Sequence, residues 1–399
     1  MQIRQINQGF NFDKYPTFNQ DINPKQRAWI EVKGKALETN VKQLRKKLSK
    51  NCQFMAVVKA DGYGHDAKVV SDYAIKGGAS QLGVATLKEG IKLRSFGVKK
   101  PILILGNLYT KRDLIIAFKN DLMPTISSIR ECLICNNIGK NVGLKFSLHL
   151  KVDTGMSRLG FELNKFVQQF EKIISFENIS IEGIYSHLSS ADENNVLDPK
   201  SVTQLQRLKF NKLLKQINLD RNNKIKIHLA NSAGMLLNKD FHYHMVRVGL
   251  SMYGYCPIAK IDKNLSLKPA LFLKVKVAFI RIIEPGVSVS YGGNFVSSRR
   301  TKLAVLSIGY ADGVPRNLSG KIKVLHNKKF YPQVGSITMD QMMVDITGSN
   351  EIRIGSTMLL LGSDGDKTIS PLEWARKSNT IPWEILCSFK NRLPRVQVD

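Results

Sequence analysis

Several polar residues follow directly after short apolar runs, and Lys59 is the first of them. It ends the run Phe54–Lys59 within AVVKADGYGH, ahead of a glycine-rich loop with Tyr63 and His65. A lysine desolvated at such a position loses part of its charge and becomes a nucleophilic amine that can form a Schiff base with a carbonyl group. A strand-end lysine can equally extend its ammonium group into solvent, so Lys59 alone does not decide the chemistry.

Four later apolar runs also end in ionisable or hydrogen-bonding residues. Five run ends of this kind are hard to explain as ordinary capped or paired residues, so they indicate a shared site. The residues are Lys151, Asp153 and Arg158 in KVDTGMSRLGF, His187 and Asp192 in YSHLSSADE, His228, Asn231 and Ser232 in HLANS, and Arg247 and Gly249 in VRVGLSMYG.

The two last runs offer donors for a phosphate group. Asn231, Ser232 and the glycines after Arg247 supply amide, hydroxyl and backbone N–H groups where barrels commonly hold phosphate. No GxxxxGK[ST] loop is present and no GxGxxG follows a strand, so a nucleotide is less favoured. A reactive lysine beside a phosphate site points to pyridoxal 5'-phosphate, whose aldehyde takes the lysine as an imine and whose ring delocalises a carbanion.

The first two thirds of the chain alternate between short apolar runs and longer amphipathic stretches, which is typical of repeated βα units. Eight strands with intervening helices predict an α/β fold, a (β/α)8 barrel of the TIM type, in which catalytic groups lie at strand ends. The predicted strands are Phe54–Lys59, Leu82–Thr86, Ile102–Gly106, Leu122–Ser127, Lys145–Asp153, Ile181–Leu188, Ile225–Asn231 and Met245–Gly249, with helices such as Asp66–Lys76, Leu87–Phe96, Asn164–Phe176 and Val202–Ile217.

After Pro269 the pattern changes to β-branched apolar runs separated by turn signals, such as Ala270–Ile283, Lys302–Ser307 and Met342–Ile346. These runs predict a second, mainly β domain. We therefore expect a polar lead-in over residues 1–26, a barrel over residues 27–265 and a β domain over residues 266–399.

The composition excludes several classes of protein. The 399 residues include 60 Lys and Arg against 32 Asp and Glu, a net charge of +28, but the basic residues are scattered without long runs, which disfavours nucleic acid binding. The apolar runs are too short to span a membrane and no signal peptide is visible, so we expect a cytoplasmic protein without membrane partners. Five cysteines fit a reducing compartment, and Cys132-x-x-Cys135 lacks a second pair, so no metal site is expected.

From about Ala28 to Arg395, the chain resembles the bacterial alanine racemases, which depend on pyridoxal phosphate. AVVKADGYGH, KVDTGMSRLGF and HLANS resemble the barrel motifs of that family, and SVSYGGNF, SIGYADGVPR and VGSITMDQMMVDIT resemble those of its C-terminal β domain. The resemblance implies a homodimer in which each active site is completed by the β domain of the partner subunit. It implies interconversion of L-alanine and D-alanine, which supplies peptidoglycan precursors, with a broader small amino-acid racemase, acting for example on serine, as the alternative.

The resemblance also implies the roles of individual residues. Lys59 would hold the cofactor and exchange the α-proton on one face of the substrate, and Tyr291 would do so on the other, because racemisation requires proton transfer on both faces. Arg158 and His187 would support the Tyr291 phenolate, and Arg247 would face the pyridine nitrogen. The remaining implied roles are cofactor binding by Tyr63, His228, Asn231, Ser232, Gly249 and Trp383, substrate binding by Arg158 and Met339, an entrance lined by Asp192, Tyr310 and Arg316, and a carbamylated side chain at Lys151.

The sequence departs from the family at Trp383, where a tyrosine usually reaches the phosphate.

Two other classes of pyridoxal phosphate protein share the barrel. Decarboxylases of basic amino acids pair the pyridine nitrogen with an acidic residue, where Arg247 stands here, and pyridoxal phosphate homeostasis proteins lack the β domain that carries Tyr291 and Met339. Both are therefore disfavoured.

Overall fold

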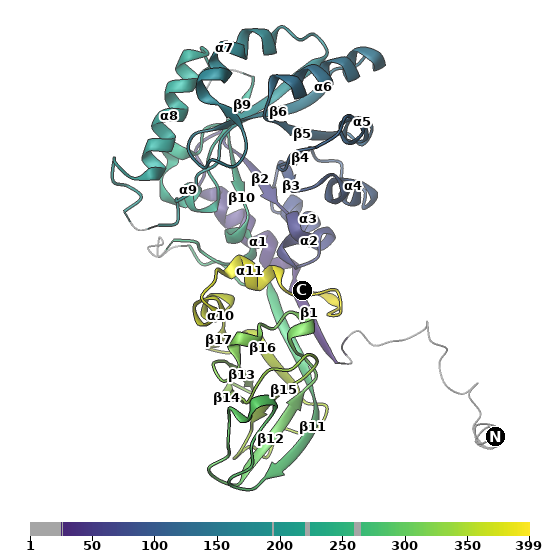
Figure 1. Cartoon of the computed structure of the whole chain (residues 1–399), viewed down its shortest axis with the longest axis vertical. Helices are drawn as coiled ribbons and strands as arrows, with labels where there is room; N and C mark the ends of the chain where they lie inside the picture. The colour runs from purple at the N-terminus through teal and green to yellow at the C-terminus, as the bar shows by residue number, and fades with distance from the viewer. Residues whose placement is uncertain (1–24, 26, 194, 220–223, 259–264) are drawn as a thin grey trace, which may run out of the picture. The chain divides into compact units, whose positions relative to one another are not determined.

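The computed structural model describes residues 25, 27–193, 195–219, 224–258 and 265–399 (Figure 1). The chain divides into two compact units. The barrel unit contains residues 32–271 and 397–399, and the β unit contains residues 272–396 together with the described residues up to 31. Apart from residue 25, the predicted lead-in over residues 1–26 lies outside the described residues.

Eight parallel strands of the barrel unit form a closed ring. Each strand pairs with the next, β5 pairs with β6, and β10 pairs back to β2, with Val246 opposite Phe54. The predicted (β/α)8 barrel is confirmed. The ring strands are β2 (Gln53–Val57), β3 (Gln81–Val84), β4 (Ile102–Ile104), β5 (Leu122–Ile126), β6 (Phe146–Asp153), β8 (Ile179–Tyr185), β9 (Lys226–His228) and β10 (Met245–Val248), and the short β7 (Phe161–Glu162) pairs with β6 outside the ring.

Amphipathic helices lie on the outside of this ring (Figure 1). Helix α7 buries Phe166, Phe170 and Ile173, which are spaced at four and three residues and so share one face. This spacing explains why the helical stretches could be predicted. The helices are α1 (Gly34–Lys46), α2 (Lys59–Tyr63), α3 (Ala67–Lys76), α4 (Leu87–Ser95), α5 (Lys111–Lys119), α6 (Ile129–Val142), α7 (Leu163–Ile174), α8 (Val202–Gln216) and α9 (Ser232–Leu237).

The β unit is built on antiparallel strands. Six of them, β11, β12, β15, β14, β13 and β16, pair in that order, and β16 pairs back to β11, with Leu303, Val324 and Leu360 among the buried side chains. The mainly β second domain is thus confirmed. Its strands are β11 (Leu271–Ile283), β12 (Thr301–Leu306), β13 (Lys323–His326), β14 (Lys329–Val334), β15 (Met342–Asp345), β16 (Thr357–Asp364), β17 (Lys367–Ile369) and β18 (Arg395–Val398), and its helices are α10 (Pro371–Ser378) and α11 (Pro382–Cys387).

One early strand lies elsewhere than we expected. Strand β1 (Ala28–Lys33) is a neighbour of β11 and β18 in the sheet of the β unit. Residues 28–31, which the sequence pattern places in the barrel, therefore belong to the β unit, and the described residues 266–271, which it places in the β domain, belong to the barrel unit.

Candidate active site

The ends of the barrel strands bring five predicted site residues into one region. Lys59 follows β2, Lys151 lies on β6, His187 follows β8, His228 ends β9 and Arg247 lies on β10. In a parallel barrel, the carboxyl ends of all strands open at the same face. The sequence pattern of polar residues after apolar runs therefore produces a single cluster.

Arg247 is a buried cation whose hydrogen-bond partners are all neutral. Nη1 donates to Nδ1 of His228 at 3.0 Å, and Nη2 lies 3.0 Å from Nδ1 of His187. Nη2 also donates to the carbonyl oxygens of Ser186 at 2.8 Å and Leu229 at 3.0 Å. Burial lowers the pKa of Arg247 to about 10, so the group stays charged at neutral pH. Its Nε–H has no acceptor among the described residues and is available to a bound acceptor.

The contact with Arg247 fixes the tautomer of a histidine pair behind it. A guanidinium only donates, so Nδ1 of His228 carries a lone pair and its Nε2 carries the proton. That Nε2 lies 2.9 Å from Nδ1 of His149, which accepts the hydrogen bond, so the proton of His149 is on its own buried Nε2. Burial lowers the pKa of His149 to about 3 and the pKa of His228 well below its usual value, so both imidazoles stay neutral.

Lys59 begins a turn with an unusual backbone. Ala60, Asp61 and Gly62 have φ values of 53°, 52° and 64°, and Tyr63 has a φ of 52°. For residues other than glycine, the left-handed conformation costs about 1–2 kcal/mol each. The neighbouring structure must therefore stabilise this turn, which places the amine of Lys59 at one end and the phenol of Tyr63 at the other.

Tyr63, Gly249 and Ser232 form a small cradle of donors. A Cβ atom on Gly249 would lie 2.5 Å from the hydroxyl oxygen of Tyr63, so glycine is required for the phenol to lie there. The backbone N–H of Gly249 donates to Oγ of Ser232 at 3.0 Å. A phenol, a hydroxyl and backbone N–H groups gathered at one point suit a phosphate group. Together with the available Nε–H of Arg247, this cradle fits the two ends of pyridoxal phosphate.

The comparisons with known proteins place the chain in a family. Family models described as alanine racemase, N-terminal domain and alanine racemase, C-terminal domain match residues 32–257 and 270–397.

The chain belongs to the alanine racemase family. It is 50% identical over 377 residues to the alanine racemase of Prochlorococcus marinus, which covers 94% of this chain and 97% of that protein. The solved alanine racemase of Clostridium difficile 630 matches with a TM-score of 0.86 and 32% identity, over 93% of this chain and 96% of that one. An alanine racemase from Bartonella henselae, with covalently bound pyridoxal phosphate, matches with a TM-score of 0.82 and 29% identity. The match covers 93% of this chain and 99% of that one. The predicted family and enzyme class are confirmed.

Lys151 differs from a solvent-exposed lysine. Its side chain is buried, and its Nζ lies 5.6 Å from the ring centre of Tyr185. Burial and the charges of Arg247 and Arg158 lower its pKa to about 8, with a smaller contribution from Lys59. A substantial fraction of the amine is therefore uncharged at slightly alkaline pH.

Two predicted cofactor ligands have their side chains bonded to protein. Both ring nitrogens of His228 are occupied, by Arg247 and His149. Oδ1 of Asn231 caps α9 by accepting from the N–H of Gly234 at 2.9 Å, and its Nδ2 lies 3.4 Å from the carbonyl oxygen of Leu188. The hydrogen-bonding groups of these two side chains are therefore used within the protein, and the side chains position neighbouring residues of the site.

The remaining predicted residues are accessible. In the barrel unit, Arg158 and Asp192 are exposed. In the β unit, Tyr291, Met339 and Tyr310 are 74%, 53% and 40% exposed. The other two predicted residues of the β unit are Arg316, which is exposed, and Trp383 on α11, which is half-buried.

Sequence reasoning missed His149 and Glu89. His149 is two residues before Lys151 on β6, so the alternation along a strand could have indicated that both face inward. Glu89 is three residues after Thr86, the spacing of a capping box, and it also binds the backbone N–H of Ala60. Both contacts join residues far apart in the sequence.

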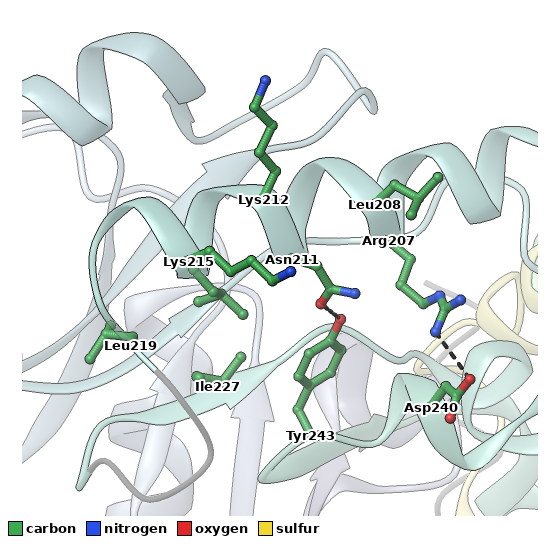
Figure 2. Close-up of a pocket in the computed structure, with 10 residues that line it drawn as sticks. Arg207, Leu208, Asn211, Lys212, Lys215, Leu219, Ile227, Asp240 and Tyr243 are labelled. Carbon is green, nitrogen blue, oxygen red and sulfur yellow. Dashed lines mark hydrogen bonds and ion pairs between the residues drawn. The ribbon is translucent and has the colours of Figure 1, made fainter.

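The structure also contains a groove of about 660 Å³ along α8 (Figure 2). It is lined by Asn211, Lys212 and Tyr243, among others, and the ion pair between Arg207 and Asp240 lies across it at 3.1 Å. No predicted site residue lines this groove. Within the described residues, no three His, Cys, Asp or Glu side chains gather as a metal site, and no helix is long and apolar enough to cross a membrane.

Proposed function

We propose that this member of the alanine racemase family interconverts L-alanine and D-alanine with pyridoxal phosphate. The observation that carries the proposal is the arrangement in the barrel unit. Lys59 and Tyr63 share one turn, Tyr63 lies against Gly249, and the Nε–H of Arg247 has no acceptor in the described part of the chain. When bound, the cofactor would delocalise the negative charge that develops at the α-carbon of the amino acid.

Each end of the cofactor has its own partners in this proposal. Lys59 would hold the aldehyde carbon, and Tyr63, Ser232 and Gly249, whose N–H donates to Oγ of Ser232 in this structure, would hold the phosphate. Arg247 would donate a hydrogen bond to the pyridine nitrogen and keep its own proton, since its pKa of about 10 lies well above that of a pyridine. By keeping its proton, Arg247 would leave the pyridine ring a weaker electron acceptor, which suits racemisation and disfavours transamination.

Two bases on opposite faces perform the proton exchange. Nζ of Lys59 removes or returns the α-proton on one face, and the phenol of Tyr291 from a partner subunit does so on the other. Neutral His187, whose Nδ1 lies beside Arg247, presents an Nε2–H that can donate to the Tyr291 phenolate. Arg158 adds the positive charge that a phenolate requires at neutral pH.

Further residues bind and admit the substrate. The guanidinium of Arg158 and the backbone N–H of Met339 orient the carboxylate, and Asp192, Tyr310 and Arg316 line the entrance. We also propose a homodimer with shared active sites, as in the family that the chain belongs to, in which the β unit of one subunit serves the barrel unit of its partner. We also propose a cytoplasmic role in D-alanine supply for peptidoglycan.

Lys151 carries a carbamate in this proposal. The uncharged amine that its pKa of about 8 makes available would add to carbon dioxide, forming the N–C bond and releasing a proton. The carbamate would neutralise part of the positive charge of Arg158 and Arg247. Intact mass spectrometry tests this, because the adduct should disappear after acidification and return with bicarbonate.

The direct test is to incubate the purified protein with L-alanine and pyridoxal phosphate and to measure D-alanine. Lys59→Ala should lower the rate by at least about a thousandfold, because it removes both the cofactor attachment and one base. Tyr291→Phe should remove the other base and slow both directions by at least about a hundredfold. A wild-type protein that makes no D-alanine, or a fully active Lys59→Ala variant, would contradict the proposal.

A further inference from the structure

Two helices of the barrel unit, α4 and α6, begin with the same capping box. Thr86 and Ser128 are the N-caps, and Glu89 and Glu131 are the third residues. In both boxes, Oε2 of the glutamate accepts from the N–H of the cap residue at 3.1 Å and from the N–H before it at 2.7 Å. The two helix starts therefore provide a matched pair.

The two glutamates differ in the use of their second oxygen. Oε1 of Glu89 accepts from the backbone N–H of Ala60 at 2.7 Å, whereas Oε1 of Glu131 has no hydrogen bond within the described residues. One carboxylate thus joins the loop after β3 to the turn after β2. One turn further along α4, Lys92 forms an ion pair with Asp61 at 3.1 Å, so α4 holds two successive residues of that turn.

The turn that Glu89 holds is the one that starts at Lys59. Its left-handed residues, Ala60 and Asp61, would relax to ordinary backbone angles without support. A relaxed turn would move the amine of Lys59 relative to the phenol of Tyr63, which lies against Gly249. Those two groups bind opposite ends of the cofactor in the proposed function.

We propose that Glu89 is a positioning residue for Lys59, which fixes the direction of its amine by binding the N–H of Ala60. The inference rests on the proposed function for its catalytic consequence. Displacing a reacting group by about 1 Å can lower a rate about a hundredfold, so a backbone contact beside the nucleophile can matter as much as a contact with substrate.

The experiment compares Glu89→Gln with Glu131→Gln. Each change removes one negative charge from a helix start, and glutamine still serves a capping box through its oxygen. At residue 89, however, the amide NH2 would face the N–H of Ala60, so the bond to the turn is lost. We expect equal thermal unfolding midpoints, a kcat for alanine about tenfold lower in Glu89→Gln only, and a KM within about twofold of wild type.

Two further measurements separate the loss of this backbone contact from the loss of a negative charge. Hydrogen–deuterium exchange of the cofactor-free protein should be about tenfold faster at Ala60 in Glu89→Gln and unchanged in Glu131→Gln. Glu89→Asp keeps the charge but is too short to join both loops, so it should behave like Glu89→Gln.

Equal kinetics and equal exchange in Glu89→Gln and Glu131→Gln would overturn the inference. Wild-type behaviour of Glu89→Asp would also overturn it, because the lower kcat of Glu89→Gln would then come from the lost charge. Faster exchange at Ala60 without any D-alanine formation by the wild type would instead contradict the proposed function and leave the contact intact.

Discussion

In the barrel unit, Arg247 and His228 are almost completely buried and bonded to one another, whereas in the β unit the side chains of Tyr291 and Met339 are 74% and 53% exposed. The barrel groups obtain their charge states within their own unit, because burial and the neighbouring guanidinium keep His228 neutral. The phenol of Tyr291 makes no hydrogen bond within the described residues.

In the proposed function, the two units therefore contribute to a site in different ways. The barrel unit would supply buried groups that are already bonded to one another, and the β unit would supply exposed groups that acquire a role when another surface covers them. A second copy of the chain would supply that surface in the proposed homodimer. The following predictions test how far this division holds.

The greatest change in activity should come from mixing two inactive variants. Lys59→Ala and Tyr291→Phe should each be nearly inactive, but a hybrid dimer has one site with both native residues. Refolding the two together in equal amounts should restore about a quarter of the wild-type activity, since about half of the dimers are hybrids with one intact site each. No recovery, despite hybrid dimers seen by native mass spectrometry, would show that Lys59 and Tyr291 act within one chain.

Gly249→Ala should affect the barrel unit alone. The new Cβ atom would lie 2.5 Å from the hydroxyl of Tyr63, so the phenol must leave the cradle. We expect the affinity for pyridoxal phosphate to fall about 10- to 100-fold, the equivalent of one or two strong hydrogen bonds. Fluorescence titration of the cofactor-free protein measures this.

The control for this change is Gly83→Ala, whose Cβ would meet side-chain atoms of Leu105 and Met55 at 3.2 Å and of Val57 at 3.6 Å, and no backbone atom among these. Its cofactor affinity should stay close to that of the wild type. Equal affinities of Gly249→Ala and the wild type for pyridoxal phosphate would show that the cradle of Tyr63, Gly249 and Ser232 does not bind the cofactor.

Mild acid should destabilise the barrel unit more than the β unit. Burial lowers the pKa values of His149, His187 and His228, which return to about 6.5 on unfolding. Below pH 6.5 the unfolded chain therefore binds protons that the folded chain does not, so stability falls as the pH falls, by up to about 1.4 kcal/mol per pH unit for each histidine. Calorimetry between pH 7 and 5 should show this loss.

His149→Leu makes that test more specific. It leaves the Nε2–H of His228 without its acceptor, which should cost about 1–3 kcal/mol at pH 7.5, but it should also make the acid dependence shallower, because one buried imidazole is gone. A steeper dependence in His149→Leu would contradict the assigned neutral states.

Much of the fold could be predicted because the barrel strands are buried on both faces and read as apolar runs, and a polar residue such as Lys59 marks where each run ends. Strand β1 could not be placed, since its pairing with β11 joins segments that are far apart in the sequence. For the same reason, His149 and Glu89 were missed as site residues. Strand alternation at His149 and capping-box spacing at Glu89 are local signals, but their partners, His228 and Ala60, are distant in the sequence and are not indicated by either pattern.

The mildest change should come from Trp383, the one predicted cofactor ligand of the β unit, which is half-buried on α11. An indole can only donate, through its Nε1–H, whereas a phenol hydroxyl both donates and accepts. The hydroxyl also lies further from the backbone than Nε1 and points in another direction. Trp383→Tyr should therefore tighten pyridoxal phosphate binding about two- to fivefold, the equivalent of one neutral hydrogen bond, and shift the preference for alanine over serine. Trp374→Phe, which changes a fully buried indole on α10, should alter neither quantity. If Trp383→Tyr matches the wild type in both measurements, α11 takes no part in the site, and the cofactor is held by barrel residues alone.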